Sequence, residues 1–170
     1  MKRSSAVEVQ GDELKMSTDI SQVFAMAARG RFESHLDDPR WQTFPDGSRS
    51  IAIFFGESED GLAVFGYQVP STYRFAAHYH KTHYMSVILA GSLRVGRTWY
   101  RSGDMRMQEK GSVYGPEEAG PAGCTMLNIF ADRRGFYPSL IGEQQPDFPR
   151  VVPDVLLSNV WEPDPALEDE

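Results

Sequence analysis

Three of the chain's four histidines lie within one six-residue stretch. His78 and His80 are separated by a single residue, and His83 follows after two more. Because alternate side chains of a β-strand point to the same face, a strand here would place the imidazoles of His78 and His80 side by side. Paired imidazoles can ligate a metal or act as acid–base groups. The spacing therefore predicts a metal or acid–base site at His78 and His80.

Other side chains near this pair are candidates for the same site. Tyr84 shares the face of the two histidines across a short turn. His83 has the wrong parity on a continuous strand, but at a turn it can swing toward the pair as a third metal ligand. Arg74 has the same parity as His78 and His80. It is a candidate to point inward and bind a carboxylate or phosphate of a ligand, and the alternative is a solvated arginine at the mouth of the barrel.

The chain from residue 50 onward reads as a series of short apolar strands. Glycine or proline falls in nearly every break, including an expected tight hairpin at Gly91-Ser92, and this spacing is typical of an antiparallel sandwich or barrel. The predicted strands are Ile51–Phe55, Leu62–Val69, Tyr73–His80, Tyr84–Ala90, Leu93–Tyr100, Met105–Gln108, Ser112–Tyr114 and Cys124–Ala131. We therefore expect an all-β fold.

The two ends of the chain differ from this central part. A helix is predicted over Asp19–Gly30, because apolar residues recur on one side and Gly30 can end it. Residues 1–49 are expected to form a leader, this short N-terminal helix and a loop that packs on the barrel, which spans residues 50–141. Residues 142–170, rich in proline and acidic residues, are expected to form an irregular C-terminal tail.

Composition limits the classes of function. A length of 170 residues and an apolar fraction of 41% suit one globular domain. The net charge of −7 argues against nucleic acid or an anionic membrane as a partner. We also expect a cytoplasmic protein. Cys124 is the single cysteine and is predicted to be an inert buried thiol. No phosphate-cradling or dinucleotide motif is present, so no nucleotide cofactor is expected.

The histidine stretch resembles the first motif of the cupin superfamily, in which two histidines, a glutamate and a glycine follow one another. His78, His80 and Gly91 fall on the histidines and the glycine, whereas Tyr84 takes the glutamate position. The second motif can be laid on residues 103–118, with Tyr114 at the position of the third histidine. The resemblance implies a small, single-domain, RmlC-like bacterial cupin: an antiparallel double-stranded β-helix, or jelly-roll barrel. By the same resemblance we expect a homodimer.

The family's typical site is a divalent metal held by three histidines and a glutamate. This chain keeps two of the four ligands and carries tyrosine at the other two positions. A divalent transition metal (Fe, Ni, Zn or Mn) bound by His78, His80 and His83, with Tyr84 or Tyr114 as a phenolate ligand, is one reading. The other is a metal-free pocket in which these histidines bond to Tyr84, Tyr114 or water.

Several functions fit this pocket. The leading hypothesis is a cupin that binds a small polar or anionic organic molecule, with metal-dependent oxygenase, isomerase or lyase chemistry as its enzymatic form. Tyr84 and Tyr114 are then the catalytic candidates beside the histidines. The alternatives are a non-catalytic ligand-binding or sensing cupin with a decayed metal site, and a metal-free isomerase that uses a histidine base and a tyrosine acid. Whether the protein is an enzyme stays open.

Overall fold

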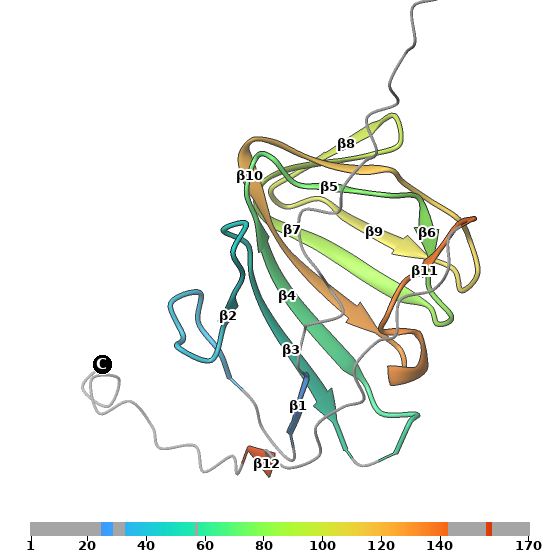
Figure 1. Cartoon of the computed structure of the whole chain (residues 1–170). Coiled ribbons are helices and arrows are strands. Elements are labelled where there is room, and N and C mark those ends of the chain that lie inside the picture. Colours follow the sequence, from blue (N-terminus) through green and yellow to red (C-terminus); the bar gives the residue numbers. More distant parts are fainter. Residues whose placement is uncertain (1–24, 29–32, 57, 143–155, 158–170) are drawn as a thin grey trace, which may run out of the picture.

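The computed structural model describes residues 25–28, 33–56, 58–142 and 156–157 (Figure 1). Nearly all regular structure in this part of the chain is β-strand, as expected. The elements are β1 (Ala25–Ala28), β2 (Gln42–Thr43), β3 (Arg49–Phe55), β4 (Ala63–Val69), β5 (Arg74–Phe75), β6 (His78–Tyr79), β7 (Tyr84–Val95), β8 (Thr98–Arg101), β9 (Met105–Gln108), β10 (Glu117–Phe130), the 3-10 turn η2 (Arg133–Gly135), β11 (Ser139–Leu140) and β12 (Leu156–Leu157).

Ten of these strands form one sheet, in the order β12-β1-β3-β4-β10-β7-β8, with β2, β5 and β9 paired to β3, β10 and β7. All pairings from β2 to β10 in this sheet are antiparallel, and β6 and β11 form a separate antiparallel pair. β5 pairs with the start of β10, and the separate β6–β11 pair lies beside the curved sheet (Figure 1). The interior between them holds the site. The division into three regions stays a prediction.

Burial on the inner face is dominated by aromatic side chains. Phe54 is 1% exposed and Phe130 is 2% exposed, and both pack against Phe136 from the segment after β10. Burying a side chain of this size stabilises the folded state by about 1.5–3 kcal/mol. A second cluster, formed by Ala28, Trp41, Ile51 and Ile53, packs on the other face of the sheet. Both faces of β3 are therefore covered.

The tight hairpin expected at Gly91-Ser92 is wrong. β7 continues through this point from Tyr84 to Val95, and β10 runs beside it and begins at Glu117, seven residues before the predicted strand Cys124–Ala131. Gly91 has a φ of +71°, and a Cβ there would lie 2.2 Å from the Gly123 carbonyl oxygen. The register shifts at the same place. Gly91 thus allows an irregularity within a long strand pair rather than a chain reversal.

The helix expected over Asp19–Gly30 is wrong where the structure describes it. Ala25–Ala28 is the strand β1, which pairs in parallel with β3 on one side and with β12 on the other. An isolated helix of this length is marginal in water, so pairing of Ala25–Ala28 with the neighbouring strands prevails over the helical pattern. The remainder of the predicted helix and most of the C-terminal tail lie outside the described residues. Within the described ranges, no helix has the length and apolar character to cross a bilayer.

Candidate functional site

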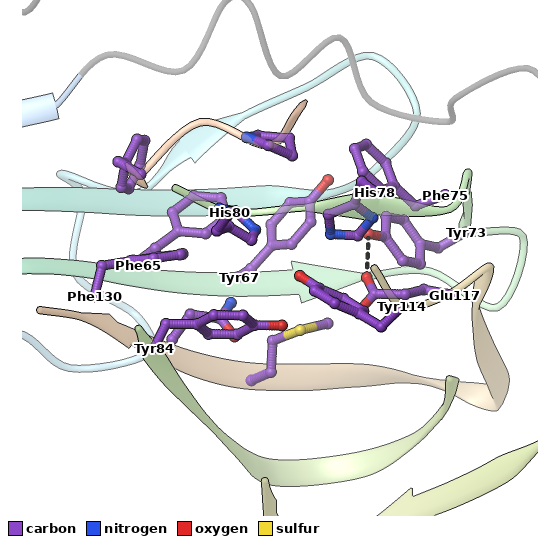
Figure 2. Close-up of a pocket in the computed structure, with 14 residues that line it drawn as sticks. Phe65, Tyr67, Tyr73, Phe75, His78, His80, Tyr84, Tyr114, Glu117 and Phe130 are labelled. Atoms are coloured by element: carbon purple, nitrogen blue, oxygen red, sulfur yellow. Dashed lines mark hydrogen bonds between the residues drawn. The ribbon is translucent and has the colours of Figure 1, made fainter. Parts of the chain in front are cut away.

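A pocket opens among side chains from β4, β5, β6, β7 and β10 and from the segment after η2 (Figure 2). The cavity volume is about 60 Å³, which is more than a single water molecule requires. Its lining residues are Phe65, Tyr67, Tyr73, Phe75, His78, His80, Tyr84, Tyr114, Glu117, Met126, Asn128, Phe130, Phe136 and Pro138. Eight of these are phenylalanine or tyrosine, so the walls are largely aromatic.

The structure brings together four of the predicted site residues. His78, His80, Tyr84 and Tyr114 all line the pocket and are largely buried. The two imidazole centroids are 5.4 Å apart, and the Tyr114 ring lies 4.3 Å from that of His78. The backbones of Tyr114 and His78 are paired, which explains why residues so distant in sequence share one wall. The roles predicted for these residues are not decided by their proximity alone.

Each imidazole is oriented by a backbone carbonyl. The Nδ1 atom of His78 lies 2.8 Å from the Ala76 oxygen, and that of His80 lies 2.6 Å from the Gly135 oxygen. A carbonyl oxygen only accepts, so each Nδ1 carries the proton and donates it. Nε2 of each neutral ring therefore keeps its lone pair. Two hydrogen-bond acceptors are thus fixed on the wall of the pocket.

Both histidines remain neutral at physiological pH. Burial lowers the pKa of His78 to about 4, with a smaller contribution from the positive charge of Arg106. Burial also lowers the pKa of His80 to about 3, and the neighbouring His78 adds to the shift. A general base works best when its pKa lies near the working pH. These two imidazoles are therefore poor proton acceptors, although their Nε2 atoms remain good hydrogen-bond acceptors.

These shifts make the stability of the fold depend on pH. The unfolded chain protonates its histidines near pH 6.5, whereas the folded imidazoles stay neutral, so the free energy of unfolding should fall as the pH drops. Each histidine should cost about 2 kcal/mol between pH 6.5 and 5. Urea unfolding at a series of pH values measures the slope. A variant with His78→Gln and His80→Gln should lose most of it, and an equally steep slope in that variant would contradict the account.

Both tyrosines keep their protons. Burial raises the pKa of Tyr84 to about 12 and raises that of Tyr114 well above its usual value. Their ring centroids lie 5.8 Å apart, and the Tyr84 hydroxyl accepts a hydrogen bond from the Arg106 guanidinium. The pocket therefore presents phenols rather than phenolates beside the imidazoles.

Arg106 and Glu117 belong to this site and were missed from the sequence. The Arg106 guanidinium lies 4.2 Å from the Tyr114 ring centroid and 3.8 Å from the Glu117 carboxylate. Glu117 lines the pocket and accepts a hydrogen bond from the Tyr73 hydroxyl (3.2 Å; Figure 2). Burial raises the pKa of Glu117, while the charge of Arg106 opposes that shift. The two charges offset each other behind the tyrosine pair.

A sequence signal for Arg106 existed in the alternation along β9. Met105 and Met107 are 65% and 79% exposed, whereas the Arg106 side chain between them is 9% exposed and lies opposite the buried Ser86. This strand turns its polar residue inward and its apolar residues outward, the reverse of the usual pattern. Glu117 gave no such signal, because it lies outside the strands predicted from the sequence.

His83 does not join His78 and His80. It is exposed and precedes β7, on the side away from the pocket, where it lies near Leu62 and Met107 in a shallow apolar depression. Its Nδ1 atom accepts a long hydrogen bond from the Lys110 backbone N–H (3.4 Å). In this arrangement His83 cannot act as the third ligand of a metal held by the other two histidines.

Arg74 does not line the pocket either. Its guanidinium forms an ion pair with Glu118 (2.7 Å) and is partly exposed. The parity argument failed because the chain bends at residues 76–77, between β5 and β6. As a result, Phe75 and His78 both point into the pocket, although an odd-numbered and an even-numbered residue of one continuous strand would point to opposite faces. The pocket therefore lacks the arginine that was expected to bind an anion.

The donor set does not suit a tightly bound divalent metal. No cluster of three or more histidine, cysteine or acidic side chains arranged for a metal occurs among the described residues. Mononuclear sites generally use three or four protein ligands, whereas the pocket lining supplies two imidazoles, and either phenol would have to lose its proton to become a third ligand. The positive charge of Arg106 also acts on both histidines and would repel a cation between them.

The antiparallel sheets and the inward histidine pair define the chain as a cupin. The model of the ChrR cupin-like domain family matches residues 27–131, so the chain belongs to that family. No curated protein shows significant similarity to it.

Several solved structures are similar to this chain at low sequence identity. A putative acetylacetone dioxygenase from Methylibium petroleiphilum PM1 superposes with a TM-score of 0.50 at 16% identity, covering 60% of this chain and 77% of that one. A chain in the complex of Rhodobacter sphaeroides SigE with the anti-sigma ChrR gives 0.48 at 20% identity, covering 56% and 51%. A Bacillus subtilis oxalate decarboxylase variant gives 0.46 at 23% identity, covering 56% and 27%. The chain thus spans about half the length of the ChrR-complex chain and about a quarter of the decarboxylase.

Proposed function

We propose that this cupin binds a small, uncharged organic molecule without a tightly bound divalent metal. The ligand has an apolar body and a hydroxyl or N–H group that donates a hydrogen bond to the imidazoles. The observation that carries this proposal is the pair of neutral histidines, each fixed through Nδ1 to a carbonyl, on the wall of an aromatic pocket. The homodimer expected from the family resemblance stays a prediction.

The charges around the pocket favour a neutral ligand over an anion or a cation. No lysine or arginine is among the lining residues, and Glu117, which does line it, is offset by Arg106. Burying an unpaired charge costs far more than burying a hydrogen-bonded neutral group. An anion would meet the lone pairs of two imidazoles, and a cation would meet the field of Arg106. The anionic ligand expected from the sequence therefore loses its main support, which was an arginine pointing into the pocket.

The same features favour binding over proton transfer. A histidine base with a pKa of about 3 or 4 accepts protons weakly at neutral pH, and each Nδ1 is held by a carbonyl rather than by a carboxylate. Tyr84, with a pKa of about 12, is likewise a weak proton donor at neutral pH. We therefore favour a ligand-binding or sensing module over a metal-free isomerase.

Three probes of similar shape test the proposed ligand class. Phenol carries the donor, toluene lacks it at nearly the same size, and benzoate carries a negative charge. We expect phenol to bind at least about tenfold more tightly than toluene, because only phenol satisfies an imidazole acceptor. Benzoate should bind least. Titrations followed by protein NMR, in buffer with a chelator, give the three dissociation constants.

A variant with His78→Phe and His80→Phe provides the control. It keeps aromatic rings in place but removes both acceptors, so it should bind phenol and toluene almost equally. The proposal is wrong if benzoate binds most tightly to the wild type, or if phenol binds only when a divalent metal is added.

A further inference from the structure

Asn128 places an amide group on a wall of the pocket that the two histidines do not form. It lies on β10, whereas His78 lies on β6 and His80 directly follows that strand. Along this part of β10 every second residue is buried, and Met126, Asn128 and Phe130 all line the pocket. Because alternate side chains of a strand share a face, the amide of Asn128 points inward with its two neighbours.

Within the described part of the chain, the Asn128 amide has no hydrogen-bond partner. The residue is only 9% exposed, yet no described residue donates to its side chain or accepts from it. Phe65, which lies opposite on β4, has no polar group to offer. An asparagine side chain carries two N–H donors and a carbonyl acceptor, and buried polar groups in folded proteins are nearly always hydrogen-bonded. This amide is therefore an exception that points to a ligand.

The histidines and Glu117 differ from Asn128 in this respect. Both imidazoles donate through Nδ1 to backbone carbonyls, and Glu117 accepts a hydrogen bond from Tyr73. Each imidazole therefore presents a single remaining acceptor, whereas Asn128 presents two donors and an acceptor. A ligand that only donates a hydrogen bond, as the histidines require, would leave the N–H groups of Asn128 unsatisfied.

An amide group on the ligand would satisfy this side chain. A primary carboxamide or a lactam carries an N–H and a C=O side by side, so it can form two parallel hydrogen bonds with the side chain of an asparagine. Asparagine pairs with adenine in the same two-bond manner. A ketone would accept one hydrogen bond and leave Oδ1 of Asn128 unpaired. A carboxylate would bring a charge into a pocket whose lining offers no lysine or arginine to balance it.

We propose that the ligand of this pocket is a neutral carboxamide or lactam on an apolar ring, and that Asn128 selects it through a pair of hydrogen bonds. This inference rests on the function proposed above and narrows its ligand class. The ring packs among the aromatic side chains, the amide pairs with Asn128, and a second N–H or a hydroxyl of the ligand donates to an imidazole. Asn128 is thus a residue that determines specificity.

Benzamide and acetophenone are the matched probes, because they differ only in an NH₂ group in place of a methyl group. We expect the wild type to bind benzamide at least about tenfold more tightly than acetophenone in titrations followed by protein NMR, in buffer with a chelator. Asn128→Leu keeps nearly the same volume but removes the amide, so this preference should fall by at least about threefold. Met126→Leu, on the same strand and in the same pocket, is the control and should retain the preference.

Urea unfolding of Asn128→Leu distinguishes a binding role from a structural one. Because no described residue holds the amide, replacing it with an apolar side chain should leave the midpoint of unfolding unchanged or raise it. A lower midpoint, or a variant that does not fold, would overturn the inference, since the amide would then support the fold itself.

Phenol and toluene keep this inference apart from the proposed function. If phenol binds the wild type more tightly than toluene but Asn128→Leu retains the full preference for benzamide, the pocket binds hydrogen-bond donors and Asn128 does not select the ligand. The inference is equally wrong if the wild type shows no preference for benzamide. If phenol and toluene bind the wild type alike, the proposed function fails and the inference falls with it.

Discussion

Replacing Tyr114 with histidine is expected to turn the pocket into a zinc site. The Tyr114 backbone is paired with that of His78, and its ring already contacts the His78 ring. Tyr114→His would therefore add a third imidazole to the two whose Nε2 atoms are free. Three histidines are a sufficient protein ligand set for zinc. We expect Zn²⁺ to bind at least about tenfold more tightly than to the wild type, as measured by calorimetry.

Tyr114→Phe is the matched control for this experiment. It removes the same hydroxyl group but adds no ligand, so it should bind zinc no better than the wild type. Adding His78→Ala to Tyr114→His should remove the gain. If the wild type already bound zinc tightly, or if Tyr114→His bound zinc no better than Tyr114→Phe, the claim that a missing third ligand prevents tight zinc binding would be wrong.

Removing the Arg106 charge is expected to destabilise the fold severely. The side chains of Arg106 and Glu117 are 9% and 11% exposed and lie 3.8 Å apart. Arg106→Met would leave the Glu117 carboxylate buried without its cation and the Tyr84 hydroxyl without its donor. Breaking a buried charge pair in this way typically costs about 3–5 kcal/mol. The loss should appear as a lower midpoint in urea unfolding.

The double variant Arg106→Met with Glu117→Gln separates pairing from simple packing. Because neither charge remains, it should recover a large part of the stability lost by Arg106→Met alone. Glu117→Gln by itself should also be destabilising, since it leaves the guanidinium unpaired. If the costs of the two single changes simply added in the double variant, the two charges would not be coupled and this view of the site would fail.

The sequence was sufficient for the mostly β class and for placing the two paired histidines in one pocket. His78 and His80 are separated by one residue and are followed by an apolar run and a glycine. This pattern predicted strands with inward imidazoles, and the structure places both histidines in the pocket. The match of the ChrR cupin-like domain model confirms the family. Tyr84 and Tyr114 were assigned to the site through motif positions, and they too line the pocket.

The errors arose where local parity or propensity was extended too far. A bend between β5 and β6 removed Arg74 from the pocket, and the position of His83 just before β7 placed it on the outer side. Gly91 marked an irregularity inside a strand pair instead of a hairpin. The ion pair of Arg106 and Glu117 joins β9 to the start of β10, and no local pattern specifies a contact of that kind.

Nitrogen NMR of the pocket histidines at neutral pH tests the central claim most directly. Long-range ¹⁵N–¹H spectra report which ring nitrogen carries the proton and whether the other one is free, hydrogen-bonded or bound to a metal. We predict that His78 and His80 are both neutral with the proton on Nδ1, that a chelator leaves their spectra unchanged, and that phenol shifts an Nε2 signal. Nε2 signals that change when a chelator removes bound metal, or an imidazolium form of either ring, would contradict a metal-free pocket for a neutral ligand.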